Sequence, residues 1–194
     1  MNTSIFLIRH GITEGNERKW YYGSSDLPLS AEGMEEIKRL SGEGIYPLPD
    51  GAAFFVTELM RTRQTLFLIY GNVPYRVIPE LNEMSFGRYE KKSHQELMES
   101  ERYRKWLKTG DRDLAFPAGE SINGFNERIM RGFSGLLSFH ERKSIVICHG
   151  GAISHIMAEC FPEEKEHFIQ WIPLPGRGFC LHLNDGKVCG HEAL

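Results

Sequence analysis

The sequence predicts an α/β protein with a three-layer α/β/α fold and a mainly parallel central sheet. Residues 5–8 and 145–148 are continuous apolar runs, as in strands that are covered on both faces. Segments with helical periodicity separate the strand candidates, and this βαβα order is typical of a parallel sheet. The chain has 194 residues, the length of one packed domain, so we expect residues 1–194 to form a single domain.

The first half of the chain predicts two helices and two further strands after residues 5–8. Ser30 is a helix-capping residue, and Met34, Ile37 and Leu40 then repeat on one helical face as far as Gly42. The remaining elements are a strand at 54–56, a helix that Thr57 introduces and that reaches Leu68, and a short strand at 75–78, which Pro79 ends.

The second half predicts three helices, one buried strand and a closing hairpin. Ser93 and Glu96 form a capping-box pattern that opens a charged helix to about Lys108, and a polar loop follows at 109–119. The further elements are a helix at 121–136, the strand at 145–148, a helix after Gly151, and a hairpin of 178–183 with 187–189 around Asp185-Gly186.

The composition excludes several classes of protein. Hydrophobic residues make up 41% and charged residues 25% of the chain, as in an ordinary globular protein. A net charge of -3 argues against a nucleic-acid binder or a membrane-surface binder, since both are usually basic. We find no signal-peptide pattern and no apolar run of about 20 residues, so we expect a cytoplasmic protein without a membrane span. The four cysteines (Cys148, Cys160, Cys180 and Cys189) form no CxxC pair, which indicates reduced thiols rather than a zinc site.

Two predicted strands end in the same way, with a histidine followed by a glycine. His10 follows the first strand and His149 follows the strand at 145–148. Because the carboxyl ends of parallel strands lie at one edge of the sheet, we expect both imidazoles to face one cavity. Either histidine alone is more often structural, but the repetition at two strand ends favours a shared site.

Two arginines belong to the same edge. Arg9 precedes His10, and Arg61 opens the helix after the second strand. The positive end of the helix dipole disfavours a cation there, so Arg61 indicates a bound anion, although a surface cation is the simpler interpretation. Together these arginines, the imidazoles and the helix amides predict a phosphate pocket.

Such a pocket needs a nucleophile and a proton donor. Histidine can act as a covalent nucleophile through a ring nitrogen. Glu83 follows the third strand and reaches the same edge, where an anionic neighbour favours the protonated form of a general acid. From position alone, a solvated surface glutamate is the alternative. We find no HExxH, Walker or aspartate-cluster motif, so we expect neither a metal nor a cofactor.

Five segments resemble the histidine phosphatase superfamily in order and spacing. They are FLIRHGITEGN (6–16), DLPLSAEG (26–33), TELMRTRQT (57–65), LNEMSFGRYE (81–90) and ICHGGAI (147–153). This is the family of cofactor-dependent phosphoglycerate mutases and related phosphatases, and the resemblance spans residues 5–160. It implies a phosphoglycerate mutase-like fold, in which His10 is phosphorylated, Arg9, Arg61 and His149 bind phosphate, and Glu83 is the acid. It also implies that Asn16, Gly23 and Gly150 line the pocket.

The resemblance separates two branches of the family. About 30 residues lie between Glu90 and Glu120, a short insertion that is similar to the phosphatases rather than the mutases. Mutases also need cations for a second phosphate. Arg102, Arg104 and Lys105 are candidates, although a solvated helix face is the more common explanation.

Residues 22–29 and 81–87 resemble the α-ribazole phosphatases of cobalamin nucleotide-loop assembly. In this reading Tyr22 stacks on a base, with simple packing as the alternative, and Arg18 is either a phosphate ligand or a surface cation. His155 and the remaining histidines are expected to be structural.

The expected function is therefore hydrolysis of a small phosphorylated metabolite, such as α-ribazole 5′-phosphate. A phosphoglycerate mutase is the main alternative, and a non-catalytic phospholigand binder is a third. The sequence leaves the oligomeric state open.

Overall fold

The computed structural model describes residues 2–165 and 167–194. Its main sheet has six strands in the order β4-β3-β6-β1-β7-β8. The strands are β1 (Asn2–Arg9), β3 (Ala53–Val56), β4 (Arg76–Val77), β6 (Lys143–Cys148), β7 (Gly178–Asn184) and β8 (Lys187–Ala193). β4, β3, β6 and β1 are parallel, while β7 runs antiparallel to both β1 and β8. The mainly parallel sheet is confirmed.

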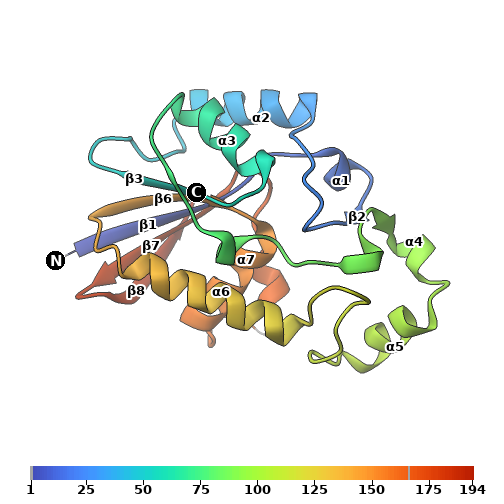
Figure 1. Cartoon of the computed structure of the whole chain (residues 1–194). Coiled ribbons are helices and arrows are strands. Elements are labelled where there is room, and N and C mark those ends of the chain that lie inside the picture. Colours follow the sequence, from blue (N-terminus) through green and yellow to red (C-terminus); the bar gives the residue numbers. More distant parts are fainter. Residues whose placement is uncertain (1, 166) are drawn as a thin grey trace.

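Helices cover both faces of this sheet, as predicted. α2 (Ala31–Gly42) and α3 (Met60–Tyr70) lie on one face, and α6 (Ile122–Leu137) and α7 (Gly150–Cys160) lie on the other (Figure 1). The three-layer α/β/α prediction is therefore confirmed. None of the helices in the described part of the chain is both long enough and apolar enough to cross a membrane.

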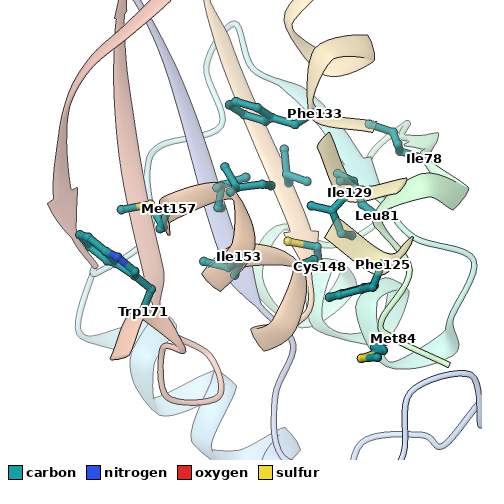
Figure 2. Close-up of a cluster of buried hydrophobic side chains, with 14 of the residues drawn as sticks. Ile78, Leu81, Met84, Phe125, Ile129, Phe133, Cys148, Ile153, Met157 and Trp171 are labelled. Atoms are coloured by element: carbon teal, nitrogen blue, oxygen red, sulfur yellow. The ribbon is translucent and has the colours of Figure 1, made fainter. Parts of the chain in front are cut away.

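Alternate residues of the central strands build two hydrophobic cores. Leu7 and Val146 face α6 and α7, while Ile8 and Ile147 face α3. Because both faces are buried, the strands read as continuous apolar runs in the sequence. Figure 2 shows the larger core, in which Cys148 lies among side chains of α6 and α7.

The predicted caps and the hairpin turn are also confirmed. The side chains of Ser30 and Ser93 each accept a hydrogen bond from the backbone N–H three residues later. Ser121, expected only to start a helix, caps α6 in the same way. Asp185 and Gly186 have φ angles of 49° and 78°, as a two-residue hairpin turn requires.

Two predicted helix boundaries are wrong. The charged helix at 93–108 is two helices, α4 (His94–Leu97) and α5 (Glu101–Thr109), because the side chain of Ser100 caps the N–H of Tyr103 and starts a new helix. α3 begins at Met60 rather than at Thr57. The hydroxyl of Thr57 instead contacts the ring of His149.

Several short elements were not predicted. They are α1 (Glu14–Glu17), β2 (Trp20–Tyr21), β5 (Lys92–Ser93) and the 3-10 helices η1 (Pro79–Leu81), η2 (Gly87–Tyr89) and η3 (Phe168–Trp171). β2 pairs with β5 in a separate small sheet. This sheet, α1, α4 and α5 lie beyond the carboxyl ends of the parallel strands (Figure 1). They therefore add walls at the edge where the site is expected.

Candidate active site

His10 follows β1 directly and is only 2% exposed. Its Nδ1 lies 2.7 Å from the carbonyl oxygen of Gly11. Since a carbonyl can only accept, Nδ1 carries the proton and the lone pair is on Nε2. Burial lowers the pKa of His10 well below its ordinary value, and the nearby charges of Arg61 and Arg9 lower it further. The ring is therefore neutral at physiological pH and has a free nucleophilic nitrogen.

His149 lies beside His10, as the matching strand ends predicted. The ring centroids are 5.2 Å apart with an interplanar angle of 63°. The backbone holds the pair in register, because the N–H of His10 donates to the carbonyl of Cys148. Nε2 of His149 lies 2.9 Å from Oγ1 of Thr57, which orients the ring. Burial, followed by the charge of Arg61, lowers the pKa of His149 well below its ordinary value.

Both predicted arginines reach this pair of histidines. Arg61 is fully buried, and its two terminal nitrogens donate to the carbonyls of Ser25 and Gly23 at 2.9 and 2.8 Å. Arg9 donates to the carbonyl of Pro173 at 2.7 Å. Burial lowers the pKa of both guanidinium groups.

Three buried nitrogens of these histidine and arginine side chains have no hydrogen-bond partner within residues 2–165 and 167–194. They are Nε of Arg9, Nε of Arg61 and Nδ1 of His149. Buried polar groups in proteins are normally paired, because an unpaired donor loses its hydration without compensation. A bound oxyanion would supply acceptors for the two arginine nitrogens and, in the tautomer with the proton on Nδ1, for His149.

Glu83 lies in the loop after η1 and lines the same cavity as His10. Its Oε2 accepts a hydrogen bond of 3.0 Å from the N–H of Gly151 in the first turn of α7, and its Oε1 accepts one of 3.0 Å from the N–H of Met84. The carboxyl group is therefore held in a fixed position at the expected edge of the sheet.

Arg128 of α6 clamps the Glu83 loop, which sequence reasoning missed. Its guanidinium makes a two-pronged pair with Glu120 at 2.8 and 2.7 Å and donates to the carbonyls of Glu80, Asn82 and Glu83. Glu120 also accepts from the N–H of Ser85. The available signal was the Gly119-Glu120-Ser121 segment, whose contacts a sequence pattern does not reveal.

Glu90 is a second anchor that sequence reasoning missed. Its carboxylate accepts hydrogen bonds from the backbone N–H groups of Gly23, Ser24, Ser25 and Phe86. Burial raises its pKa, but these hydrogen bonds outweigh burial and leave the pKa below its ordinary value. Glu90 therefore fixes the loop whose carbonyls hold Arg61.

Of the predicted substrate-binding residues, Asn16, Tyr22 and Gly150 line the cavity and Gly23 does not. Asn16 Oδ1 accepts from the N–H of Thr13 and from the hydroxyl of Tyr22. Gly150 begins α7 and lies close to Arg9, since a Cβ there would be 3.1 Å from Nε of Arg9. A side chain at position 150 would therefore crowd the phosphate end.

Tyr22 and Gly23 have other contacts. Tyr22 lines the cavity, but it is 9% exposed, packs on Gly15 and bonds Asn16 and Thr13 through its hydroxyl. This is the packing role that was the alternative to base stacking. Gly23 does not line the cavity and packs against the backbone of Met84, where a Cβ would be 1.7 Å from the carbonyl oxygen. It contributes its carbonyl to Arg61 rather than a surface to the cavity.

The cavity measures about 630 Å³ and has two halves of different chemistry. One end is polar and is lined by Arg9, His10, Asn16, Arg61, Glu83, Gly150 and Gly151; we call it the phosphate end, after the pocket that the sequence predicts. The other end, which we call the aromatic half, is lined by Trp20, Tyr21, Phe86, Trp106, Phe116, Phe125 and Phe168. Lys19, His94, His155 and several aliphatic side chains complete it.

The other cations that the sequence offered as phosphate ligands do not line this cavity. Arg102, Arg104 and Lys105 are exposed on α5, where Arg102 and Arg104 bond backbone carbonyls. Arg18 pairs with Glu14 and stacks on Trp20, as a surface cation would. His155, expected to be purely structural, lines the aromatic half.

Comparison with known proteins identifies the family. The model of the histidine phosphatase superfamily (branch 1) matches residues 5–186. The chain belongs to this superfamily. It is an enzyme of the phosphatase type, and the resemblance seen in the five sequence segments is confirmed.

Named relatives of the histidine phosphatase chain include both phosphatases and mutases. An adenosylcobalamin/alpha-ribazole phosphatase of Escherichia coli is 34% identical over 163 residues, 79% of this chain and 77% of the relative. The structure of the alpha-ribazole phosphatase from Shigella flexneri matches with a TM-score of 0.82 and 29% identity, over 96% of this chain and 93% of that one. A phosphoglycerate mutase structure from Thermus thermophilus matches with a TM-score of 0.71 and 28% identity, over 99% of each chain.

Proposed function

We propose that the protein hydrolyses a phosphomonoester through a phosphohistidine on His10. The observation that carries this proposal is the set of three unpaired buried nitrogens, on Arg9, Arg61 and His149, around a neutral histidine. Such a set matches the oxygens of a phosphoryl group. Nε2 of His10 is the nitrogen whose lone pair is free to attack phosphorus.

In the first step, Nε2 of His10 bonds to phosphorus as the bond from phosphorus to the ester oxygen breaks. The leaving oxygen takes a proton from the carboxyl group of Glu83, which the N–H groups of Gly151 and Met84 hold in place. Arg9 and Arg61 balance the charge on the phosphoryl oxygens, and this positioning is most of what phosphoryl transfer requires.

In the second step, water attacks the phosphohistidine. Glu83, now a carboxylate, takes a proton from that water. The bond between Nε2 and phosphorus breaks, inorganic phosphate leaves, and the neutral imidazole of His10 is restored. The same carboxyl group therefore acts first as an acid and then as a base.

We propose α-ribazole 5′-phosphate as the substrate, with a role in assembly of the cobalamin nucleotide loop. The names of the Escherichia coli and Shigella flexneri relatives support this choice, and so does the aromatic half of the cavity, which suits a ring-bearing leaving group. We propose that the enzyme is cytoplasmic and forms a single domain. The four free cysteines support a reducing compartment.

Mutase activity is the competing function, since the Thermus thermophilus mutase structure is also similar. The exposed positions of Arg102, Arg104 and Lys105 favour hydrolysis, because a second phosphate needs several cations inside the cavity. Among the described residues, Lys19 is the one cation that lines the aromatic half. An assay of 2- and 3-phosphoglycerate interconversion with bisphosphoglycerate separates the two functions. Robust turnover in that assay would refute our choice.

The test of the proposal compares His10→Ala with His182→Ala, a matched histidine on β7. The native enzyme and His182→Ala should hydrolyse p-nitrophenyl phosphate and form an acid-labile phosphohistidine that ³¹P NMR detects after quenching. His10→Ala should do neither. Phosphatase activity that survives in His10→Ala would refute the nucleophile, and inhibition by EDTA would refute the metal-independent chemistry.

A further inference from the structure

His155 lies in the aromatic half with one ring nitrogen committed and one free. Its Nδ1 bonds Oδ1 of Asn126 on α6 at 2.8 Å. Because that amide oxygen only accepts, Nδ1 carries the proton. Nε2 has no partner in the part of the chain that the structure describes, and the ring lines the cavity. His155 is only 4% exposed and lines the cavity, so its ring is largely shielded from bulk water.

The surroundings keep His155 neutral. The rings of Phe125 and Phe168 pack on it with centroid distances of 5.1 and 4.6 Å. Burial, followed by the charge of Arg112, lowers the pKa of His155 to about 4. Arg112 approaches from the loop before α6 and stacks on the outer ring, Phe168. A neutral ring with its proton on Nδ1 presents Nε2 as a hydrogen-bond acceptor.

His155 lies on α7 one helical turn from Gly151, the residue that holds the proposed acid Glu83. Gly151 and His155 are four residues apart, so they lie on the same helix face about one turn, roughly 5–6 Å, from each other. Gly151 holds the carboxyl group of Glu83, which protonates the leaving oxygen. A sugar attached to a leaving oxygen at Glu83 would therefore lie along the same helix face as His155.

The rest of the aromatic half limits what that ligand is. Its rings come from β2, the loop at 82–86, α5, the loop at 110–121, α6 and η3. Lys19 is the one fixed charge among the described residues that line it. Aromatic side chains favour stacking with a flat, uncharged ring system. A nucleoside combines such a ring with sugar hydroxyl groups a few bonds from its 5′ oxygen.

We infer that His155 determines specificity for a nucleoside-like 5′-phosphate by accepting a hydrogen bond from a sugar hydroxyl at Nε2. The rings of the aromatic half hold the base. This inference rests on the proposed function, in which the phosphate lies at His10 and the leaving oxygen at Glu83. It adds a residue that recognises the sugar and that takes no part in the transfer itself.

The test uses substrates that differ in one feature. They are α-ribazole 5′-phosphate, adenosine 5′-monophosphate, the 2′,3′-dideoxy analogue of each, and p-nitrophenyl phosphate. For His155→Phe we expect kcat/KM to fall about 10- to 100-fold more on the hydroxylated substrates than on their dideoxy analogues, as for loss of one buried hydrogen bond. His182→Phe is the control, because His182 pairs with Ser4 at the far end of β1 from the site.

Asn126→Asp gives a second, independent measurement. A carboxylate beside Nδ1 raises the pKa of His155 and, once the ring is protonated, turns Nε2 from an acceptor into a donor. The sugar hydroxyl then meets a donor at acidic pH and an acceptor at alkaline pH, so the preference for hydroxylated over dideoxy substrate should change with pH, while the native preference changes little. A merely structural histidine would not produce this pH dependence.

Two results would overturn the inference. Equal losses on all five substrates in His155→Phe would mean a structural role. Hydrolysis of p-nitrophenyl phosphate without hydrolysis of either nucleoside phosphate would remove the sugar site but leave the phosphohistidine chemistry standing. Failure of the native enzyme on p-nitrophenyl phosphate would instead refute the proposed function itself.

Discussion

The carboxyl group of Glu83 and the backbone N–H of Gly151 are joined by a hydrogen bond of 3.0 Å. This contact ties the loop after η1 to the first turn of α7, the helix that follows His149. The N–H group holds the carboxyl group of Glu83 in a fixed position at the N-terminus of that helix. The proposed acid and the phosphate-binding end of the cavity are therefore parts of one rigid arrangement.

Gly151→Ala tests that arrangement. An added Cβ would lie 2.3 Å from Oε1 of Glu83, so the carboxyl group must move. We expect kcat on alkyl phosphates to fall about 10- to 100-fold, as for a displaced general acid. Gly135→Ala on α6 is the matched control, since a Cβ there meets nothing within 4 Å. It should keep full activity and gain up to about 1 kcal/mol in stability. Equal kinetics in the two variants would contradict the role of the contact.

Glu83→Gln should lower kcat about 10²- to 10⁴-fold on substrates with poor leaving groups, because the amide cannot deliver a proton. The loss should be smaller on p-nitrophenyl phosphate, whose leaving group needs no proton. Steady-state kinetics on alkyl and aryl phosphates measure the difference. If both classes lose activity equally, Glu83 is not the general acid.

Arg128→Lys should loosen the Glu83 loop while keeping the charge. Lysine cannot make the two-pronged pair with Glu120 or reach all three carbonyls that Arg128 binds. We expect a loss of about 1–3 kcal/mol in the free energy of unfolding, measured in urea, and a larger fall in kcat on alkyl than on aryl phosphates. Arg131→Lys, on the exposed face of the same helix, is the control. An unchanged alkyl-to-aryl ratio in Arg128→Lys would limit Arg128 to stability.

Stability should fall as the pH falls below about 6.5. The pKa values of His10, His149 and His155 are lowered in the folded protein, so the unfolded chain takes up protons first and gains stability. Between about pH 7.5 and about pH 5.5, each should cost about 1.4 kcal/mol in the free energy of unfolding. Urea titrations at the two pH values measure the drop, and His155→Phe should reduce it by one histidine's share. Equal stability at both pH values would contradict the burial of neutral imidazoles.

Much of the fold and of the phosphate end could be predicted from local patterns. The continuous apolar runs before His10 and His149 predicted parallel strands, and parallel strands bring their carboxyl ends to one edge. The serine caps and the Asp185-Gly186 turn were readable because a cap or a tight turn depends on a few neighbouring residues. The break between α4 and α5 at Ser100 was not predicted, because one charged helix and two short capped helices have similar sequences.

The sequence by itself determined the sheet, its helical layers and the strand ends that bring His10, His149 and Glu83 to one edge of the sheet. Contacts distant along the chain belonged to the tertiary structure alone. The clamp of Arg128 on the Glu83 loop and the anchoring of residues 23–25 by Glu90 are such contacts. So is the place of His155 in the aromatic half. Burial and hydrogen-bond partners decide what a charged or imidazole side chain does, and both are set only when separate elements pack together.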